Sequence, residues 1–194
     1  MAMTCVLWGN ESLLVQCAGM ALDRGNTIAA VVTDSADVRG WAEGRGLRVE
    51  APGADLAARL GGGFDWLLSI ANLSIIPADV LALPARGAVN FHDGPLPRHA
   101  GLNAPVWALI EGETRHGVTW HLIEGGVDQG DVLVQAEFDV TAQDTALTLN
   151  TKAYEAAMGS FPLLLDQLES GALARVAQDL TQRSYHALAD RPEG

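Results

Sequence analysis

The chain has 194 residues, of which 48% are hydrophobic and 19% are charged. This length and composition suit one medium-sized domain that buries its core without disulfides or a metal, and they argue against intrinsic disorder. The formal net charge is −12, because 12 basic residues face 24 acidic ones. A surface this negative repels phosphate groups, so we expect neither nucleic acid nor a membrane as a partner.

The sequence predicts a cytoplasmic protein. No apolar run approaches the ~20 residues needed to cross a bilayer. The first five residues carry neither the basic region nor the cleavage pattern of a secretion signal. Cys5 and Cys17 lie in apolar segments and are too few for a disulfide framework, so we expect both to be reduced core residues.

In the first half of the chain, short apolar runs alternate with helical patterns. This alternation is typical of βαβ units and predicts an α/β fold with a Rossmann-like, twisted, mostly parallel sheet flanked by helices. The predicted strands are residues 4–8, 27–33, 47–49, 65–70 and 87–92. The predicted helices are a segment that ends at Gly25, residues 36–43, residues 54–60 and a short helix that begins at Pro77.

The pattern changes after the fifth predicted strand. Residues 94–97 contain a glycine and two prolines and must form a loop. The further predicted elements are a helix at 104–111, strands at 116–123 and 131–138 around a glycine-rich loop, and a helix at 145–169 that bends near Pro162. Periodicity is weak from residue 178 onward. We therefore expect one domain over residues 1–177, without an internal boundary, and a tail or linker over residues 178–194.

Asn90 and His92 stand two apart on a predicted strand, so their side chains point to the same side, ~6–7 Å apart. They lie at the carboxyl end of that strand, where open α/β sheets bind ligands. An amide donor beside an imidazole can stabilise a developing oxyanion while the imidazole handles a proton. A motif this short is more often a cap or a packing contact than a site.

Asp128 lies in the glycine-rich loop at residues 124–130. A carboxylate near His92 would fix the tautomer of the imidazole and favour its protonated form. Alternatively, Asp128 shapes the turn through its own backbone, as aspartate often does. The residues alone leave both interpretations open.

The stretch from Ser69 to Gln135 resembles the formyltransferase family that uses 10-formyltetrahydrofolate. The matching motifs are Asn90-Phe91-His92, Leu96-Pro97, Gly101, Pro105, Gly117-Val118-Thr119 and Asp128-Gln129-Gly130. The separation of 36 residues between His92 and Asp128 is also that of the family. The resemblance implies a formyltransferase fold, with residues 1–177 as the catalytic domain.

The resemblance also implies the chemistry. An amine would attack the formyl carbon of 10-formyltetrahydrofolate without a metal. Asn90 and His92 would hold the oxyanion, and Asp128 would orient His92 and assist proton transfer through water. The folate ring would lie against Leu73, Ser74, Ile75, Ile76, Glu124, Gly125, Gly126 and Val127. For the apolar members of this set, core packing is the alternative explanation.

The chain departs from the family pattern beside the proposed catalytic residues. The usual Ser-Leu-Leu-Pro is replaced by Gly94-Pro95-Leu96-Pro97, and Pro105 follows Gly101 by four residues where the family has three. Both changes leave Asn90, His92 and Asp128 in place but reshape the acceptor side. A catalytically silent module that binds folate or docks a partner is therefore an alternative function, and a hydrolase that releases formate is another.

The acceptor amine follows by exclusion. Glu11, in the first loop, would oppose the ribotide phosphate of purine-pathway enzymes. Initiator-tRNA enzymes carry an additional basic domain, whereas this chain is acidic. Its sequence most resembles the formylation domain that initiates nonribosomal peptide synthetases, through the form of residues 90–97, 101–105 and 117–122.

The expected acceptor is accordingly an aminoacyl group on the phosphopantetheine of a peptidyl carrier protein, with an adenylation domain as a neighbouring partner. A nucleotide-sugar N-formyltransferase is the alternative. Residues predicted for the acceptor entrance are Pro95, Arg98, His99 and Asn103, and an ordinary surface loop would explain them equally well. No Cys/His cluster has metal-binding spacing, and His116 and His121 are expected on opposite sides of one strand.

Overall fold

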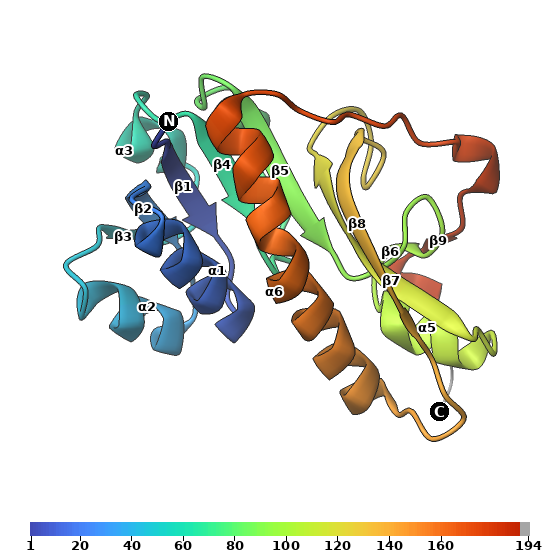
Figure 1. The fold of residues 1–194 in the computed structure, drawn as a ribbon. Helices are drawn as coiled ribbons and strands as arrows, with labels where there is room; N and C mark the ends of the chain where they lie inside the picture. Colours follow the sequence, from blue (N-terminus) through green and yellow to red (C-terminus); the bar gives the residue numbers. More distant parts are fainter. Residues whose placement is uncertain (191–194) are drawn as a thin grey trace. The chain divides into compact units, whose positions relative to one another are not determined.

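The computed structural model describes residues 1–190. Seven strands form one mostly parallel sheet in the order β3-β2-β1-β4-β5-β7-β8, and helices flank it, as the sequence predicts (Figure 1). The chain forms two compact units, Met1–Asn90 with Leu165–Ala172, and Phe91–Leu164 with the residues from Leu173 onward.

The first unit contains a parallel sheet of buried, apolar strands. The strands are β1 (Thr4–Trp8), β2 (Thr27–Val32), β3 (Val49–Glu50), β4 (Trp66–Ser69) and β5 (Gly87–His92), the last of which crosses into the second unit. β1 pairs in parallel with β2 and β4, and β4 pairs in parallel with β5. All four residues of β4 are buried, which fits a central strand covered on both faces. These pairings align the carboxyl ends of the strands at one edge of the sheet.

The helices of the first unit cover this sheet with one apolar face each. They are α1 (Ser12–Asp23), α2 (Ala36–Glu43), α3 (Leu56–Leu60) and α4 (Ala78–Leu81). α1 lies alongside β1 and buries a stripe that includes Leu13 and Cys17 (Figure 1). Ser35 caps the N-terminus of α2, because its side chain accepts a hydrogen bond from the Val38 N–H. Cys5 and Cys17 are free and buried, and burial raises the pKa of both thiols, so neither is a ready nucleophile.

The second unit combines an antiparallel strand pair with a long helix. Its elements are β6 (Ala100–Gly101), α5 (Ala104–Ile110), β7 (Arg115–Leu122), β8 (Val132–Asp139), α6 (Ala146–Ser170), β9 (Tyr185–His186) and two short 3-10 helices, Leu180–Gln182 and Leu188–Asp190. β7 pairs with β8 antiparallel, and β6 pairs with β9 parallel. The last turn of α6 belongs to the first unit.

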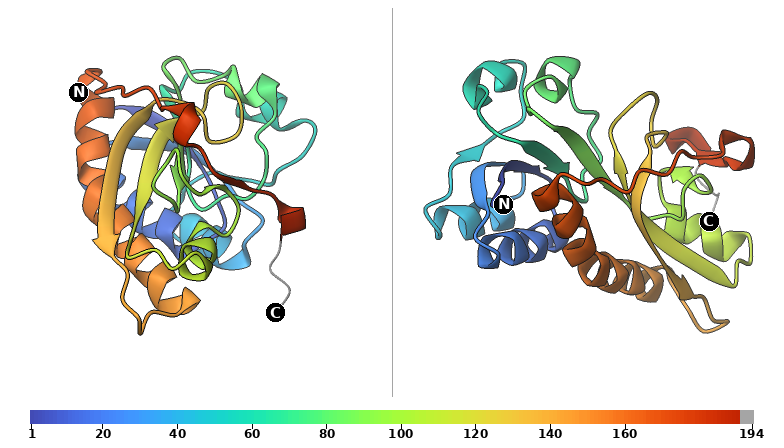
Figure 2. Two further views of the ribbon diagram at one scale, coloured as in Figure 1. Left: turned by 90° about the vertical axis from the view of Figure 1, so that its right-hand side faces the viewer. Right: turned by 45° about the horizontal axis from the view of Figure 1, so that its top comes forward.

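α6 runs beside the β7–β8 pair and packs on it through aromatic side chains (Figure 2). The fully buried ring of Trp120 lies 5.1 Å from that of Phe91 and 5.2 Å from that of Phe161, centroid to centroid. The indole N–H of Trp120 donates to Ser160 Oγ at 3.0 Å, which satisfies the one polar atom of the indole. This packing fixes the strand that carries several residues of the site described below.

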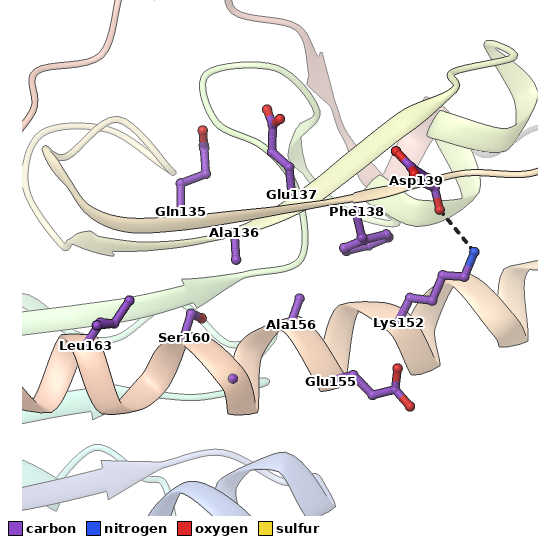
Figure 3. Close-up of a pocket in the computed structure, with 11 residues that line it drawn as sticks. Gln135, Ala136, Glu137, Phe138, Asp139, Lys152, Glu155, Ala156, Ser160 and Leu163 are labelled. Atoms are coloured by element: carbon purple, nitrogen blue, oxygen red, sulfur yellow. Dashed lines mark hydrogen bonds between the residues drawn. The ribbon is translucent and has the colours of Figure 1, made fainter.

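A surface groove of about 610 Å³ follows the line between β8 and α6. Ala136 and Phe138 face it from the strand, and Ala156 and Leu163 face it from the helix (Figure 3). At one end, Lys152 Nζ donates to the carbonyl oxygen of Asp139 at 3.0 Å (Figure 3). None of the residues predicted for catalysis lines this groove.

The structure differs from the sequence prediction mainly in the shortest elements. β3 lies at 49–50 and not at 47–49, and the two-residue strands β6 and β9 were not predicted, because two residues carry no periodicity. α6 continues through Pro162. β9 lies in the predicted tail, so part of that segment is a paired strand, while the last four residues of the tail lie outside the described range. Within residues 1–190, no helix is both long and apolar enough to span a membrane.

We predict opposite effects for two glycine substitutions in the second unit. A Cβ at Gly130 would lie 1.8 Å from the carbonyl oxygen of Leu122, so Gly130→Ala must displace backbone and lower the melting temperature. At Gly159, inside α6, a Cβ meets no atom within 4 Å, and Gly159→Ala should raise stability by about 0.5–1 kcal/mol. Thermal unfolding followed by circular dichroism measures both. Equal melting temperatures for the two variants would contradict the geometry.

Candidate active site

Asn90 and His92 lie at the carboxyl end of β5, as predicted. They are two residues apart on one strand, so their side chains emerge on the same face. Asn90 is paired in register with Ser69 of β4 and is half-buried, whereas only 5% of the His92 side chain is exposed. The strand therefore presents an amide and a desolvated imidazole at the sheet edge where parallel sheets bind ligands.

One nitrogen of His92 is held by the backbone. Its Nε2 lies 2.7 Å from the carbonyl oxygen of His99. A carbonyl only accepts hydrogen bonds, so Nε2 carries a hydrogen and Nδ1 is the nitrogen that can take up or release a proton. A Cβ at Gly94 would lie 2.8 Å from this Nε2, so a glycine at that position leaves room for the ring.

Asp128 lies beside the other nitrogen of His92. Its Oδ2 is 3.7 Å from His92 Nδ1 and accepts a hydrogen bond of 2.9 Å from the Gly101 N–H. Its Oδ1 is 3.4 Å from Nε2 of His121. The backbone of Asp128 has a φ of 54°, in the left-handed region that aspartate tolerates better than most residues. Both interpretations of Asp128 are therefore compatible with the structure: it shapes the turn and it faces the imidazole.

These contacts set the protonation state of Asp128. Burial raises the pKa of its carboxyl, but this effect is outweighed by three that lower the pKa: the hydrogen bond from His121, the positive charge of His92 and the hydrogen bond from the Gly101 N–H. The net effect is a pKa lowered from 3.8 to about 2. Asp128 is consequently an anion across the whole neutral range, although only 9% of its side chain is exposed.

A second carboxylate, Asp93, lies on the same side of the imidazole. Its Oδ1 is 3.9 Å from His92 Nδ1, and burial raises its pKa, against the opposing effect of His92. The environment thus shifts the pKa values of Asp93 and Asp128 in opposite directions, a pattern that separates acid from base roles. Next to them, burial lowers the pKa of His116 to about 4, and this ring binds the Asp93 carbonyl oxygen at 2.8 Å, so it supports the loop.

The loop that follows β5 is fastened to the β7–β8 pair by one hydroxyl group. Thr119 Oγ1 donates to the Gly94 carbonyl oxygen at 2.7 Å and accepts from the Leu96 N–H at 3.1 Å. It also accepts from Nε2 of Gln135, which in turn donates to the Leu96 carbonyl oxygen, both at 2.9 Å. All three hydrogen-bonding positions of the hydroxyl are used, so the loop is fixed through its backbone.

The predicted folate residues of the first unit form an ordered loop with two exposed apolar side chains. Leu73 is 86% exposed and Ile75 is 77% exposed, while Ile76 is buried. Asn72 holds the backbone of Ser74 through two hydrogen bonds, of 2.9 and 3.0 Å. Core packing therefore does not explain Leu73 and Ile75, whereas it does explain Ile76.

The predicted folate residues of the second unit lie in an exposed stretch, which consists of Glu124, Gly125, Gly126 and Val127. Glu124 pairs with Arg175 at 2.7 Å, and the carbonyl oxygen of Val127 accepts a hydrogen bond from Arg183 at 3.0 Å. The stretch is thus held at both ends by arginines from the segment after α6. Its glycines leave the backbone between these ends open to a ligand.

The residues predicted for the acceptor entrance divide into buried and exposed pairs. Pro95 and His99 are buried. Arg98 and Asn103 are exposed, and Arg98 pairs with Glu113 at 2.7 Å. Only the exposed pair is available for direct contact with an acceptor.

Sequence reasoning missed the role of His121 and His99 in this site. His121 supports Asp128, and the His99 backbone holds His92; the sequence offered no local signal for either contact. Within the described range, His99, Glu111 and His186 form a group of side chains able to bind a metal ion. These three residues are far apart in sequence, so spacing could not reveal the group.

A family model described as Formyl transferase matches residues 64–165, more than half of the chain. The methionyl-tRNA formyltransferase of Anaeromyxobacter sp. (strain K) is 35% identical over 163 residues, which cover 80% of this chain and 52% of that protein. The methionyl-tRNA formyltransferase of Anaeromyxobacter dehalogenans is 36% identical over the same length. The chain spans about half the length of the curated relatives it matches.

Solved structures share the fold at low sequence identity. An N-formyltransferase from Helicobacter canadensis, in complex with folinic acid and dTDP-3-aminofucose, matches with a TM-score of 0.82 and 19% identity over 99% of this chain and 73% of that one. Glycinamide ribonucleotide transformylase 1 from Symbiobacterium toebii matches with a TM-score of 0.80 and 21% identity over 92% of this chain and 95% of that one. The fold implied by the resemblance is confirmed.

The lowered pKa of Asp128 predicts an acid-sensitive contribution to stability. Because the folded-state pKa lies below the ordinary value, the ionised carboxylate stabilises the fold above about pH 4, and this stabilisation disappears as the pH falls toward about 2. The shift in pKa corresponds to about 2 kcal/mol of the free energy of unfolding. The uncharged amide of Asp128→Asn does not provide this contribution. Urea unfolding measures the free energy of unfolding of wild type and variant at neutral and at acid pH. The difference between the two proteins should be smaller at acid pH by that amount. A gap independent of pH would refute the assignment.

Proposed function

The chain belongs to the formyl transferase family, whose members are enzymes that transfer formyl groups, and we propose that it moves a formyl group from 10-formyltetrahydrofolate to an amine. One observation carries this proposal: a buried imidazole at the carboxyl end of β5, His92, faces the ionised carboxylate of Asp128. This pairing can exchange a proton at a desolvated position beside an amide donor, Asn90. Acyl transfer to an amine requires those functions.

Each residue has a distinct task in the proposed reaction. Asn90 and the imidazolium of His92 donate hydrogen bonds to the oxyanion that develops as the amine adds to the formyl carbon. Asp128 orients His92, accepts the proton released by the amine through water, and returns a proton to the folate nitrogen as its bond to the formyl carbon breaks. The new bond joins the amine nitrogen to the formyl carbon.

The exposed apolar side chains of Leu73 and Ile75 are the proposed contacts for the folate ring in the first unit. Two exposed apolar side chains on one loop offer a surface that a flat aromatic ring can cover. The family uses formyl-tetrahydrofolate, and the Helicobacter canadensis neighbour was solved with folinic acid. The backbone from Glu124 to Val127 is the proposed contact in the second unit.

For the acceptor, we retain an aminoacyl group carried by the phosphopantetheine of a carrier protein. The support is the form of the loop from Asp93 to Pro97, by resemblance to synthetase formylation domains, and the fixed backbone of that loop. The curated relatives are named for methionyl-tRNA, but the net charge of −12 opposes a polyanionic tRNA.

A nucleotide sugar is the second candidate acceptor. The solved structure with dTDP-3-aminofucose shares the fold over 99% of this chain, which favours that class. An acceptor amine on a sugar would need the same oxyanion contacts from Asn90 and His92 and the same proton transfers by Asp128. The reaction is therefore the same for both candidate acceptors. They differ in the part of the acceptor molecule that would contact Arg98 and Asn103.

We predict that His92→Ala lowers the rate by ~10²–10⁴ and that Asn90→Ala lowers it by ~10²–10³, because each removes a group that acts in the transition state. An exposed amide, Gln182, offers a matched control, and Gln182→Ala should keep wild-type activity. Folate binding, measured by fluorescence, should persist in all three variants. Activity within a few-fold of wild type for both His92→Ala and Asn90→Ala would remove the mechanism.

The acceptor is tested by intact-mass analysis. An aminoacyl carrier protein and a panel of amino nucleotide sugars are each incubated with the protein and 10-formyltetrahydrofolate, with His92→Ala as the control. A formyl mass gain on the carrier alone supports the first candidate, and a gain on a sugar alone replaces it with the second. Formate release without either product indicates hydrolysis. Folate binding without any turnover indicates a silent module.

A further inference from the structure

Three donor side chains converge at the surface of the second unit, apart from the proposed formyl-transfer residues. His99 follows the loop after β5, Glu111 follows α5, and His186 ends β9. One donor atom of each residue lies within 4.8 Å of those of the other two. Figure 1 shows β6, β9 and α5 gathered in the same region of this unit.

The distances in this group are too long for hydrogen bonds. His186 Nε2 is 3.6 Å from one Glu111 oxygen, and His99 Nε2 is 3.9 Å from the other. Two ligand atoms on a tetrahedral zinc ion, each bound at ~2.0–2.2 Å, are roughly 3.4 Å apart. The two distances to Glu111 exceed this spacing by a few tenths of an ångström, so these donors need only a small contraction to share one ion.

The His186 imidazole has no other partner for the nitrogen that it would use. His186 Nε2 is buried and has no hydrogen-bond partner among the described residues, an arrangement that costs free energy unless something binds there. The side chain of His99 is 1% exposed. Burial lowers the pKa of the His99 imidazole, against the opposing carboxylates of Glu111 and Glu113.

The geometry of the group is fixed by its surroundings. The His186 ring stacks on Trp107, with centroids 4.2 Å apart and planes 9° apart, and lies nearly parallel to the His99 ring at 5.7 Å. β6, which follows His99, is joined to β9, which contains His186, by backbone hydrogen bonds from Ala100 N–H to Ser184 O and from Leu102 N–H to His186 O. Such preorganisation is what metal sites need.

The entry side of the group is open. Glu111 is 43% exposed, so an ion can arrive from solvent and water can complete its coordination. Glu113 lies 3.5 Å from His99 Nε2 on the same side and is paired with Arg98. Its carboxylate thus lies beside the same nitrogen that would bind the ion, and adds negative charge that favours a cation there.

We infer that His99, Glu111 and His186 bind a divalent transition-metal ion, with zinc as the best match to two imidazoles and one carboxylate. The ion would join β9 to the end of α5. It would also fix His99, whose carbonyl oxygen holds the Nε2 of His92. The role is structural, and the inference does not depend on formyl transfer.

The test measures the metal directly in the full chain. After treatment with a chelator, the protein is titrated with zinc by calorimetry and with cobalt by visible absorption, where tetrahedral nitrogen and oxygen ligation gives an intense band. Wild type should bind one ion per chain, and zinc should raise the melting temperature. Absence of stoichiometric binding would overturn the inference.

Variants assign the ligands. Glu111→Gln leaves the backbone pairing of β6 and β9 intact and should weaken zinc binding by at least ~10-fold, as should His186→Gln. Glu137→Gln, an exposed carboxylate of β8, is the matched control and should bind as wild type. Unchanged affinity in Glu111→Gln and His186→Gln would place the ion elsewhere and refute the site. Metal-free melting temperatures show whether each variant is folded.

Discussion

The carboxylate of Asp128 is buried, and a buried charge persists only where hydrogen bonds and opposite charge replace the lost water. Three segments of the second unit supply that replacement: the end of β5 through His92, the backbone of β6 through Gly101, and the end of β7 through His121. The glycine-rich loop is therefore not an independent turn. Its position depends on contacts to a single anion, and the same contacts help to orient the imidazole and to hold β6.

The sequence allowed much of this arrangement to be predicted because its signals are local. β1, α2 and β5 have the predicted bounds, since an apolar run or a capped amphipathic stretch determines each of them. Asn90 and His92 could be placed on one face by the alternation of a strand. The proximity of Asp128 to His92 could be predicted only from the family resemblance, because no local pattern fixes the distance between a loop and the end of a strand.

What could not be predicted depends on contacts between distant residues. β6 and β9 are two residues each, and they exist as strands only because they pair with each other across most of the second unit. The sequence places His116 and His121 on opposite sides of one strand but gives no partner for His121. That partner is Asp128, which reaches His121 from the loop that follows β7. The group of His99, Glu111 and His186 likewise has no linear signature, since its members come from three separate elements.

The loop after β5 is held by hydrogen bonds to its backbone, and this bears on the proposed choice of acceptor. The hydrogen bonds from Thr119 and Gln135 to the loop reach only backbone atoms of Gly94 and Leu96. Substitutions at exposed positions such as Arg98 therefore leave the fastening unchanged. Under the proposed function, the choice of acceptor amine is open to change by replacing those side chains one at a time, while the imidazole and its carboxylate keep their geometry.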